Sequence, residues 1–297
     1  PGQVDAFGQS GTEALDDALA ATWGTLGHPQ VGHPLSALPI QHRLAAGRLS
    51  GNFVHDQLEW LVPELMHTRQ PVTEATEPSA WHERLQQRCE RAGYPEQAPE
   101  LADWLQQVVQ TPLPVLQAPL AQLRHGLAEM EFWLPAQALH TLRLDELCRQ
   151  HIFADLPRPA LQKTQLHGMV MGFADLVFEH GGRYWVLDYK SSRLGLDDAA
   201  YTQEAMQREM VLRRYDVQAL LYQFALHRLL AQRLGATYDP EQHLGGALYL
   251  FVRGIAHPDT HGLCWVPPPL PALQGVQTML SPAAILGDAT EATGAPA

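Results

Sequence analysis

The sequence predicts a mixed α/β domain in which helices flank one central sheet. Two short β-type runs, 176–178 and 184–187, lie on either side of the turn signal Glu179-His180-Gly181-Gly182, so they are expected to pair as a hairpin. A third and very apolar run, 247–252, follows only after two helical stretches. Strands that are both adjacent and separated by helices are typical of a mixed α/β domain.

The composition indicates a globular protein. The 297 residues suffice for one large core or two modest ones, and 45% are apolar against 18% charged. No apolar stretch approaches the roughly 20 residues that span a bilayer. The N-terminus lacks the basic and apolar regions of a signal peptide. It also lacks an initial Met, which is compatible with a fragment of a longer protein.

The three cysteines, Cys89, Cys148 and Cys264, are odd in number and far apart along the chain. This spacing argues against a disulfide framework, a zinc knuckle or an iron–sulfur cluster. Free thiols are natural in a reducing compartment, so we expect a cytoplasmic protein without a membrane partner.

The first part of the chain is expected to be mainly helical. Residues 1–36 are punctuated by Gly, Ala and Pro, and we interpret them as a linker or approach segment. A strong helix is expected after Ser50-Gly51-Asn52, where apolar residues recur at helical spacing and Pro63 should kink or end the helix. Two more helices are predicted, at 80–92 and 100–109.

The second part completes the predicted sheet. Helical stretches are expected at 197–213 and 215–234, and Gly245-Gly246 opens the apolar strand that follows. The tail from Gly287 is small and polar, which is typical of disorder. The expected organisation is a linker, one domain and a disordered tail, with boundaries at 1–36, 37–286 and 287–297.

Charged residues gather at the end of the predicted hairpin. Side chains alternate along a strand, so Asp188 and Lys190 share one face while Tyr189 points away. Asp175, on the preceding strand, can approach Asp188 across the hairpin. Two carboxylates repel each other unless a cation lies between them, and Mg²⁺ prefers such oxygen ligands. The alternative to a metal site is an exposed Asp–Lys ion pair that contributes little to stability.

A cation at this place would suit phosphodiester chemistry. Bound Mg²⁺ can polarise a phosphodiester oxygen and acidify an attacking water. Lys190 could orient that water, help to deprotonate it, or stabilise the negative transition state. Lysine is rare here, since only Lys163 and Lys190 occur among 20 basic residues. A retained lysine is suggestive because its compact ammonium fits beside a water and a metal, as a guanidinium does not.

The net charge of −12 opposes binding to DNA, whose affinity for proteins comes mainly from Lys and Arg. Either another subunit delivers the DNA, or the positive charge is local. The candidates for such a local excess are Arg208, Arg213, Arg214, Arg228 and Arg233, which could equally form a solvated helix face.

Three motifs resemble one known family. The run GFADL at 172–176 followed by LDYKS at 187–191 resembles the GxxD…DxK signature of PD-(D/E)xK nucleases, and YDVQALLY at 215–222 resembles the QxxxY element of the RecB branch. The wider run 128–254 resembles the C-terminal nuclease domain of RecB subunits in bacterial RecBCD helicase–nucleases. The resemblance covers 49–266, and it implies a restriction-endonuclease-like mixed β-sheet flanked by helices.

The resemblance implies a set of metal ligands. Asp175, Asp188 and the backbone carbonyl of Tyr189 would hold the cation, and His55 on the early helix would be a further ligand, with His67 as the alternative. Lys190 would be the catalytic lysine. The implied cofactor is Mg²⁺, which Mn²⁺ can replace, whereas Ca²⁺ can bind without supporting activity.

The family site also contains an early acidic residue. Glu129 fits best and Glu131 is the alternative. Both lie on one face of an expected strand at 128–134, and the non-functional alternative is that this face is simply exposed to solvent. Gln218 and Tyr222 are four residues apart and share a helix face. In the family this pair lines the site and helps to hold DNA, whereas the alternative is a core tyrosine beside a capped glutamine.

The expected function is Mg²⁺-dependent hydrolysis of DNA, as the nuclease module of a RecBCD-like repair complex. Single strands would be delivered by a helicase, and RecC-like and RecD-like subunits would be partners. The sequence has no phosphate-binding loop, so no ATPase motor is expected in this chain. The alternatives are a non-catalytic nuclease-fold scaffold and a stand-alone restriction-like endonuclease.

Overall fold

The computed structural model describes residues 38–68, 80–135, 139–161 and 169–280. The predictions for the linker at 1–36 and the tail at 287–297 lie outside these residues. Within them one sheet runs in the order β1-β2-β3-β4-β5, and only β3 and β4 are parallel. The strands are β1 (His125–Pro135), β2 (Met169–His180), β3 (Arg183–Lys190), β4 (Leu244–Phe251) and β5 (Leu263–Val266). The predicted mixed α/β class is confirmed.

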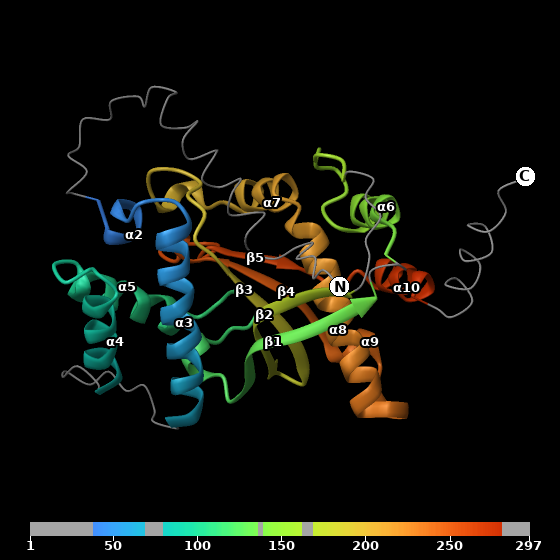
Figure 1. The fold of residues 1–297 in the computed structure, drawn as a ribbon, viewed down its shortest axis with the longest axis horizontal. Helices are drawn as coiled ribbons and strands as arrows, with labels where there is room; N and C mark the ends of the chain where they lie inside the picture. Colours follow the sequence, from blue (N-terminus) through green and yellow to red (C-terminus); the bar gives the residue numbers. More distant parts are fainter. Residues whose placement is uncertain (1–37, 69–79, 136–138, 162–168, 281–297) are drawn as a thin grey trace, which may run out of the picture.

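Helices cover both faces of the sheet (Figure 1). One face packs against α2 (Ile40–Arg43), α3 (Arg48–Thr68), α4 (Ala80–Arg91) and α5 (Ala98–Gln110). The other packs against α6 (Thr141–His151), α7 (Gln203–Leu212), α8 (Tyr215–Leu234) and α10 (Leu270–Met279). A short α9 (Pro240–His243) and the 3₁₀ turns Leu120–Gln122, Asp198–Ala200, Gly235–Thr237 and Val252–Gly254 complete the described elements.

Strand alternation divides the core in two. On β3, Leu187 and Tyr189 enter the cluster under α3 and α5, whereas Val186 enters the cluster under α8. On β4, Leu248 and Tyr249 divide in the same way. All eight residues of β4 are buried, as expected for an inner strand covered on both faces. The charged end of β3 therefore lies between two helical layers.

The hairpin turn forms as predicted. His180 pairs with Arg183, so Gly181 and Gly182 are the two turn residues. Both have a left-handed backbone, with φ of 62° and 76°, which glycine adopts without the strain that a Cβ would bring. This conformation matches the twist of the flanking strands. It fixes the register that brings Asp175 level with the end of β3.

Three expectations about element boundaries need correction. Pro63 was expected to kink or end the helix, and it does not end it: α3 continues to Thr68 because Leu61, Val62 and Leu65 on both sides of the proline pack into the core. The stretch 197–213 is not one helix, since α7 begins only at Gln203, where the Thr202 side chain caps it. Gly245 and Gly246 lie inside β4 rather than before it, and a Cβ on Gly245 would overlap the Trp185 ring.

The sequence argued against a disulfide framework and against a segment that spans a membrane. Cys89, Cys148 and Cys264 are all buried free thiols. Among the residues that the structure describes, no helix combines the length and apolar character needed to cross a bilayer.

Candidate active site

The site begins where β2 and β3 stop pairing with each other. The last pair of the ladder is Leu176 with Leu187, so Asp175 and Asp188 are the next residues on the two strands. Asp175 Oδ2 instead accepts a hydrogen bond of 2.7 Å from the backbone N–H of Tyr189. Asp175 and Asp188 are only 6% and 4% exposed, so both carboxylates lie in the interior between the strand ends.

Lys190 and Asp188 share a strand face, as the alternation predicted. Lys190 Nζ lies 2.6 Å from Asp188 Oδ2, and it donates to Gln218 Oε1 at 3.3 Å. The same ammonium lies 3.9 Å from the centre of the Tyr215 ring. The pair is buried, with side chains 12% and 5% exposed, which excludes the alternative of an ordinary exposed ion pair.

α3 brings two more potential ligands to Asp175. Gly51 permits the approach, because a Cβ at this position would lie 3.1 Å from Ser191 Oγ, just after Lys190. One turn later His55 Nδ1 lies 3.5 Å from Asp175 Oδ2 and 3.9 Å from Glu59 Oε1. The imidazole and the buried Tyr189 ring are nearly perpendicular, with centroids 6.0 Å apart.

The electrostatics of the site show crowded negative charge. Burial opposes the charge on His55, but Asp175 and Asp188 outweigh it and raise the pKa of the imidazole to about 9. Burial and the neighbouring Asp175 raise the pKa of Glu59 to about 7. Burial raises the pKa of Asp188 to about 6, although Lys190 acts in the opposite direction. The carboxylates therefore compete for the few positive groups near them.

This donor set fits a divalent cation. One ligand atom each from His55, Glu59 and Asp175 lies within 4.8 Å of the other two. His55 Nδ1 is buried and makes no well-formed hydrogen bond to the described residues. Asp175 is close enough to Asp188 for its negative charge to help raise the pKa of Asp188. A set in which carboxylate oxygens outnumber the single imidazole nitrogen suits a hard or borderline divalent cation rather than a soft metal.

Sequence reasoning missed Glu59. It lies four residues after His55 and therefore on the same helix face, so the spacing could have revealed it. The motif directed attention to the histidine alone. The predicted Tyr189 contributes its backbone N–H to Asp175, and its side chain is buried on the α3 face of the sheet, near His55.

Gln218 and Tyr222 lie beside the site on α8. Gln218 Oε1 accepts from Lys190 and from the Tyr249 hydroxyl, and its Nε2 donates to the Tyr222 hydroxyl at 2.8 Å. The Tyr222 hydroxyl in turn donates to the carbonyl of Phe173 on β2. The pair thus connects the lysine with the strand that carries Asp175. Its role in holding DNA stays a prediction.

The other sequence candidates lie farther from this centre. Glu129 is exposed and has a left-handed backbone, with φ of 50°, and it is near enough to raise the pKa of Glu59. Glu131 is exposed opposite Phe173. His67 lies near the end of α3, where Nδ1 is 2.6 Å from the carbonyl of Pro63. None of the three belongs to the group of ligand atoms from His55, Glu59 and Asp175, although the register of β1 and β2 places Glu129 across from Asp175.

Three of the five arginines proposed as a local positive patch are paired with carboxylates, and among the described residues no pairing is shown for Arg228 and Arg233. Arg208 pairs with Glu204 and Arg213 with Glu209, and Arg214 pairs with Asp145 and Asp216. These contacts weaken the expectation that α7 and α8 supply a local excess of charge for DNA.

Comparison with known proteins identifies the family of this chain. Residues 33–283 match the sequence profile of the PD-(D/E)XK nuclease superfamily. The match spans the sheet, the helices on both faces and every residue of the site described above.

Two similar proteins carry the same name. The chain is 42% identical over 218 residues to RecBCD enzyme subunit RecB of Escherichia coli, which covers 72% of this chain and 17% of that protein. It is 41% identical over 166 residues to the subunit of the same name from Haemophilus influenzae, covering 52% of this chain and 13% of the relative. The chain therefore spans less than a fifth of the length of these relatives.

Proposed function

The chain belongs to the PD-(D/E)XK nuclease superfamily, and on this basis we propose that it is a metal-dependent deoxyribonuclease that hydrolyses phosphodiester bonds. One observation carries the proposal. Asp175 and Asp188 are buried at the divergent ends of two strands beside the mostly covered Lys190, with His55 facing Asp175 from α3. A fold that had become a scaffold would have no reason to keep this charged set in the interior.

The residues divide the chemistry among them. His55, Asp175 and Asp188 would hold the cation, with the Tyr189 carbonyl as a further ligand. When bound, the cation polarises the phosphodiester and lowers the pKa of water. Burial opposes the charge on Lys190, but the ion pair with Asp188 outweighs it and raises the pKa of the ammonium, which stays charged at neutral pH. The Lys190 ammonium would stabilise negative charge on the reacting phosphoryl group. Gln218, which accepts a hydrogen bond from Lys190, would orient the ammonium.

The wider assignment rests on the relatives. Their name is RecBCD enzyme subunit RecB, and this chain corresponds to 17% of the E. coli protein. The proposal is that the chain is the nuclease module of a RecBCD-like recombinational-repair enzyme in the bacterial cytoplasm. Its substrate would be DNA, with single strands delivered by a helicase, and its partners RecC-like and RecD-like subunits. Mg²⁺ is the proposed cofactor, with Mn²⁺ as a substitute and Ca²⁺ as a non-supporting ligand.

The decisive experiment is a cleavage assay. The purified 297-residue chain is incubated with single-stranded and double-stranded DNA, with Mg²⁺ or with EDTA. Cleavage is expected only with Mg²⁺. Lys190→Ala should lower the rate by roughly 10²–10³-fold, the usual cost of losing one group that stabilises a transition-state charge. Asp188→Asn should abolish cleavage.

The control for charge is the other lysine of the chain. Lys163→Ala removes the same charge outside the motif, and it should cut DNA at the wild-type rate. Circular dichroism would verify that each variant is folded. Near wild-type cleavage by Lys190→Ala or Asp188→Asn would show that the site is assigned wrongly.

A further inference from the structure

Glu59 is the charged residue of this centre that no motif accounts for. We propose that Glu59 is a direct ligand of the divalent cation, so that α3 contributes two ligands, His55 and Glu59, one helical turn apart. The proposal rests on the proposed function, because it concerns the same cation. It adds a carboxylate to the ligand set that the sequence motifs indicate.

The geometry of α3 carries the first step. Residues four apart lie one above the other on a helix, so His55 and Glu59 face Asp175 together. The distances are 3.9 Å between His55 Nδ1 and Glu59 Oε1 and 3.5 Å between His55 Nδ1 and Asp175 Oδ2. All three ligand atoms lie within 4.8 Å of one another, which one ion with ligand bonds of about 2.0–2.2 Å can bridge after small side-chain movements.

Charge balance supplies the second step. Within the part of the chain that the structure describes, Glu59 forms no ion pair with lysine or arginine, and its partner is His55. The nearest arginine on α4 is otherwise engaged: Arg88 donates to Gln57 Oε1 and to the Asp56 carbonyl. Its guanidinium also lies 4.7 Å from the Trp60 ring centre. Two carboxylates, Glu59 and Asp175, thus approach each other with one imidazole to balance them.

Access supplies the third step. The side chain of Glu59 is 23% exposed, whereas the side chain of Asp175 is only 7% exposed. Glu59 also lines a hollow of about 380 Å³ together with Asp56, Gln57, Arg88, Arg91 and Ala92. Of His55, Glu59 and Asp175, Glu59 alone lines this hollow. A cation that arrives through the hollow would therefore meet the Glu59 carboxylate first.

The test is a titration with Mn²⁺, which accepts both imidazole and carboxylate ligands. Binding is measured by calorimetry on the whole chain without DNA, so the readout does not depend on cleavage. Glu59→Gln keeps the size of the side chain and removes its charge. We expect the affinity for Mn²⁺ to fall by roughly tenfold or more. Mn²⁺ should also raise the melting temperature of this variant less than that of the wild type.

Asp56→Asn is the matched control. Asp56 lies on the same helix and lines the same hollow, so the variant makes an equal change of charge outside the cluster. It should bind Mn²⁺ almost as the wild type does. Glu59→Asp keeps the charge on a shorter side chain, and it should bind better than Glu59→Gln if the carboxylate is a ligand.

The outcomes separate this inference from the proposed function. Equal affinities for Glu59→Gln and Asp56→Asn would overturn the ligand role of Glu59 while leaving the nuclease assignment in place. A wild-type chain that binds no Mn²⁺ would overturn both, because the proposed function requires a cation. Weaker binding by Glu59→Gln alone would support the proposal.

Discussion

Asp175 and Asp188 are chemically identical side chains that the fold treats differently. Burial alone would raise both pKa values. For Asp175, His55 and the backbone N–H of Tyr189 outweigh burial, and its pKa is lowered. For Asp188, burial and the charge of Asp175 dominate, and its pKa rises to about 6 despite Lys190. Asp175 therefore keeps its negative charge to lower pH than Asp188, whose charge is lost as the pH falls through about 6.

His55 provides a prediction at the scale of one residue. His55→Ala should weaken the binding of Mn²⁺ without abolishing it, because Asp175 and Asp188 remain and water can fill the vacated position. Calorimetric titration measures the change. His67→Ala is the matched control, since His67 lies on the same helix but contacts the Pro63 carbonyl. An unchanged isotherm for His55→Ala would mean that this histidine is only a helix-edge residue.

The sequence predicted these residues to different extents for physical reasons. Asp188 and Lys190 were predicted on one face because strand alternation is a strict period of two. Glu59 was missed because its importance depends on how α3 meets β3, a tertiary contact that Gly51 permits. Glu129 was predicted as a regular strand residue, yet its left-handed backbone departs from that pattern. Its role stays a prediction.

Among the elements, those with a strong local signal were predicted well. The hairpin has its two-glycine turn, and α8 spans Tyr215–Leu234 as expected. No element was expected at α6, β5 or α10. β5 has only four residues and ends directly before three prolines, so its pairing with β4 decides its structure. Short or weakly patterned segments depend on partners that a single sequence does not display.

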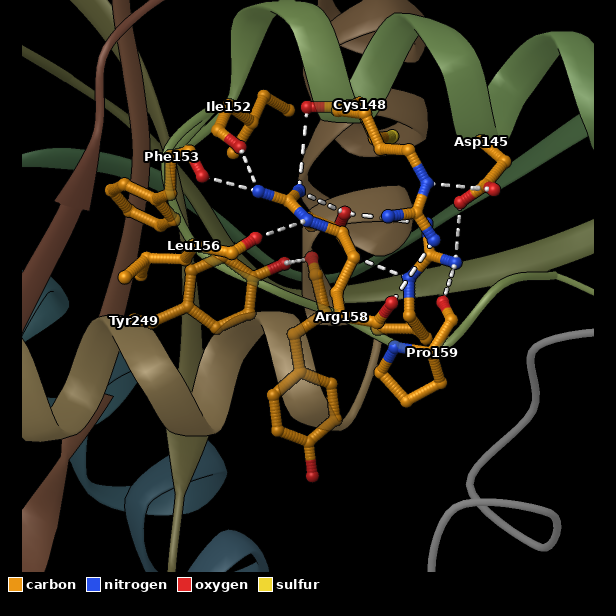
Figure 2. A network of polar contacts seen from close by, with 12 residues as sticks. Asp145, Cys148, Ile152, Phe153, Leu156, Arg158, Pro159 and Tyr249 are labelled. Carbon is orange, nitrogen blue, oxygen red and sulfur yellow. Dashed lines mark hydrogen bonds and ion pairs between the residues drawn. The ribbon is translucent and has the colours of Figure 1, made fainter.

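The N-terminus of α8 is held by a buried polar network (Figure 2). Arg158 and Asp216 form a fully buried ion pair of 2.7 Å. Arg158 also donates to the carbonyls of Cys148 and Ile152 at the end of α6. The network therefore connects α6 with the first turn of α8. The same end of α8 carries Tyr215 and Gln218, which contact Lys190.

This network gives a prediction at the scale of an element. Arg158→Leu should destabilise the chain by about 3–5 kcal/mol, the usual cost of removing one partner from a buried pair. Several carbonyls would lose their donor, and Asp216 would keep only Arg214. Urea unfolding followed by circular dichroism measures the loss.

A matched arginine on α6 serves as the control. Arg143 pairs with Glu146, and both side chains are about half exposed, at 48% and 49%. Arg143→Leu should cost less than about 1 kcal/mol, since exposed pairs contribute little. Equal losses for the two variants would mean that the buried network does not anchor α8.

At the scale of the whole molecule, the net charge and the share of the relatives that the chain covers both favour cooperation with another subunit. The net charge is −12, and three of the arginines suggested as a basic patch are paired with carboxylates. The chain corresponds to only 17% of its E. coli relative. We therefore propose that this nuclease domain, whose net charge opposes the approach of DNA, receives its substrate from another subunit.

The isolated chain should therefore be a poor nuclease whose rate falls with salt. Each phosphate contact with a single strand adds about 0.7 to the slope of log affinity against log salt, and few such contacts are available. Assembly with a DNA-translocating partner should raise the rate by increasing the local concentration of strand. The measurement is cleavage rate against salt, with and without the partner.

The chemistry itself should not change on assembly, so Asp188→Ala should abolish cleavage by both the isolated and the assembled forms. This comparison distinguishes three roles for the chain. Equal rates at physiological salt with and without the partner would contradict delivery and favour a stand-alone endonuclease. Cleavage by an assembly that contains Asp188→Ala would locate the active site in the partner and make this chain a scaffold. Loss of cleavage in both forms, together with faster cutting by the wild-type assembly, is the result expected for a nuclease module that receives its DNA from another subunit.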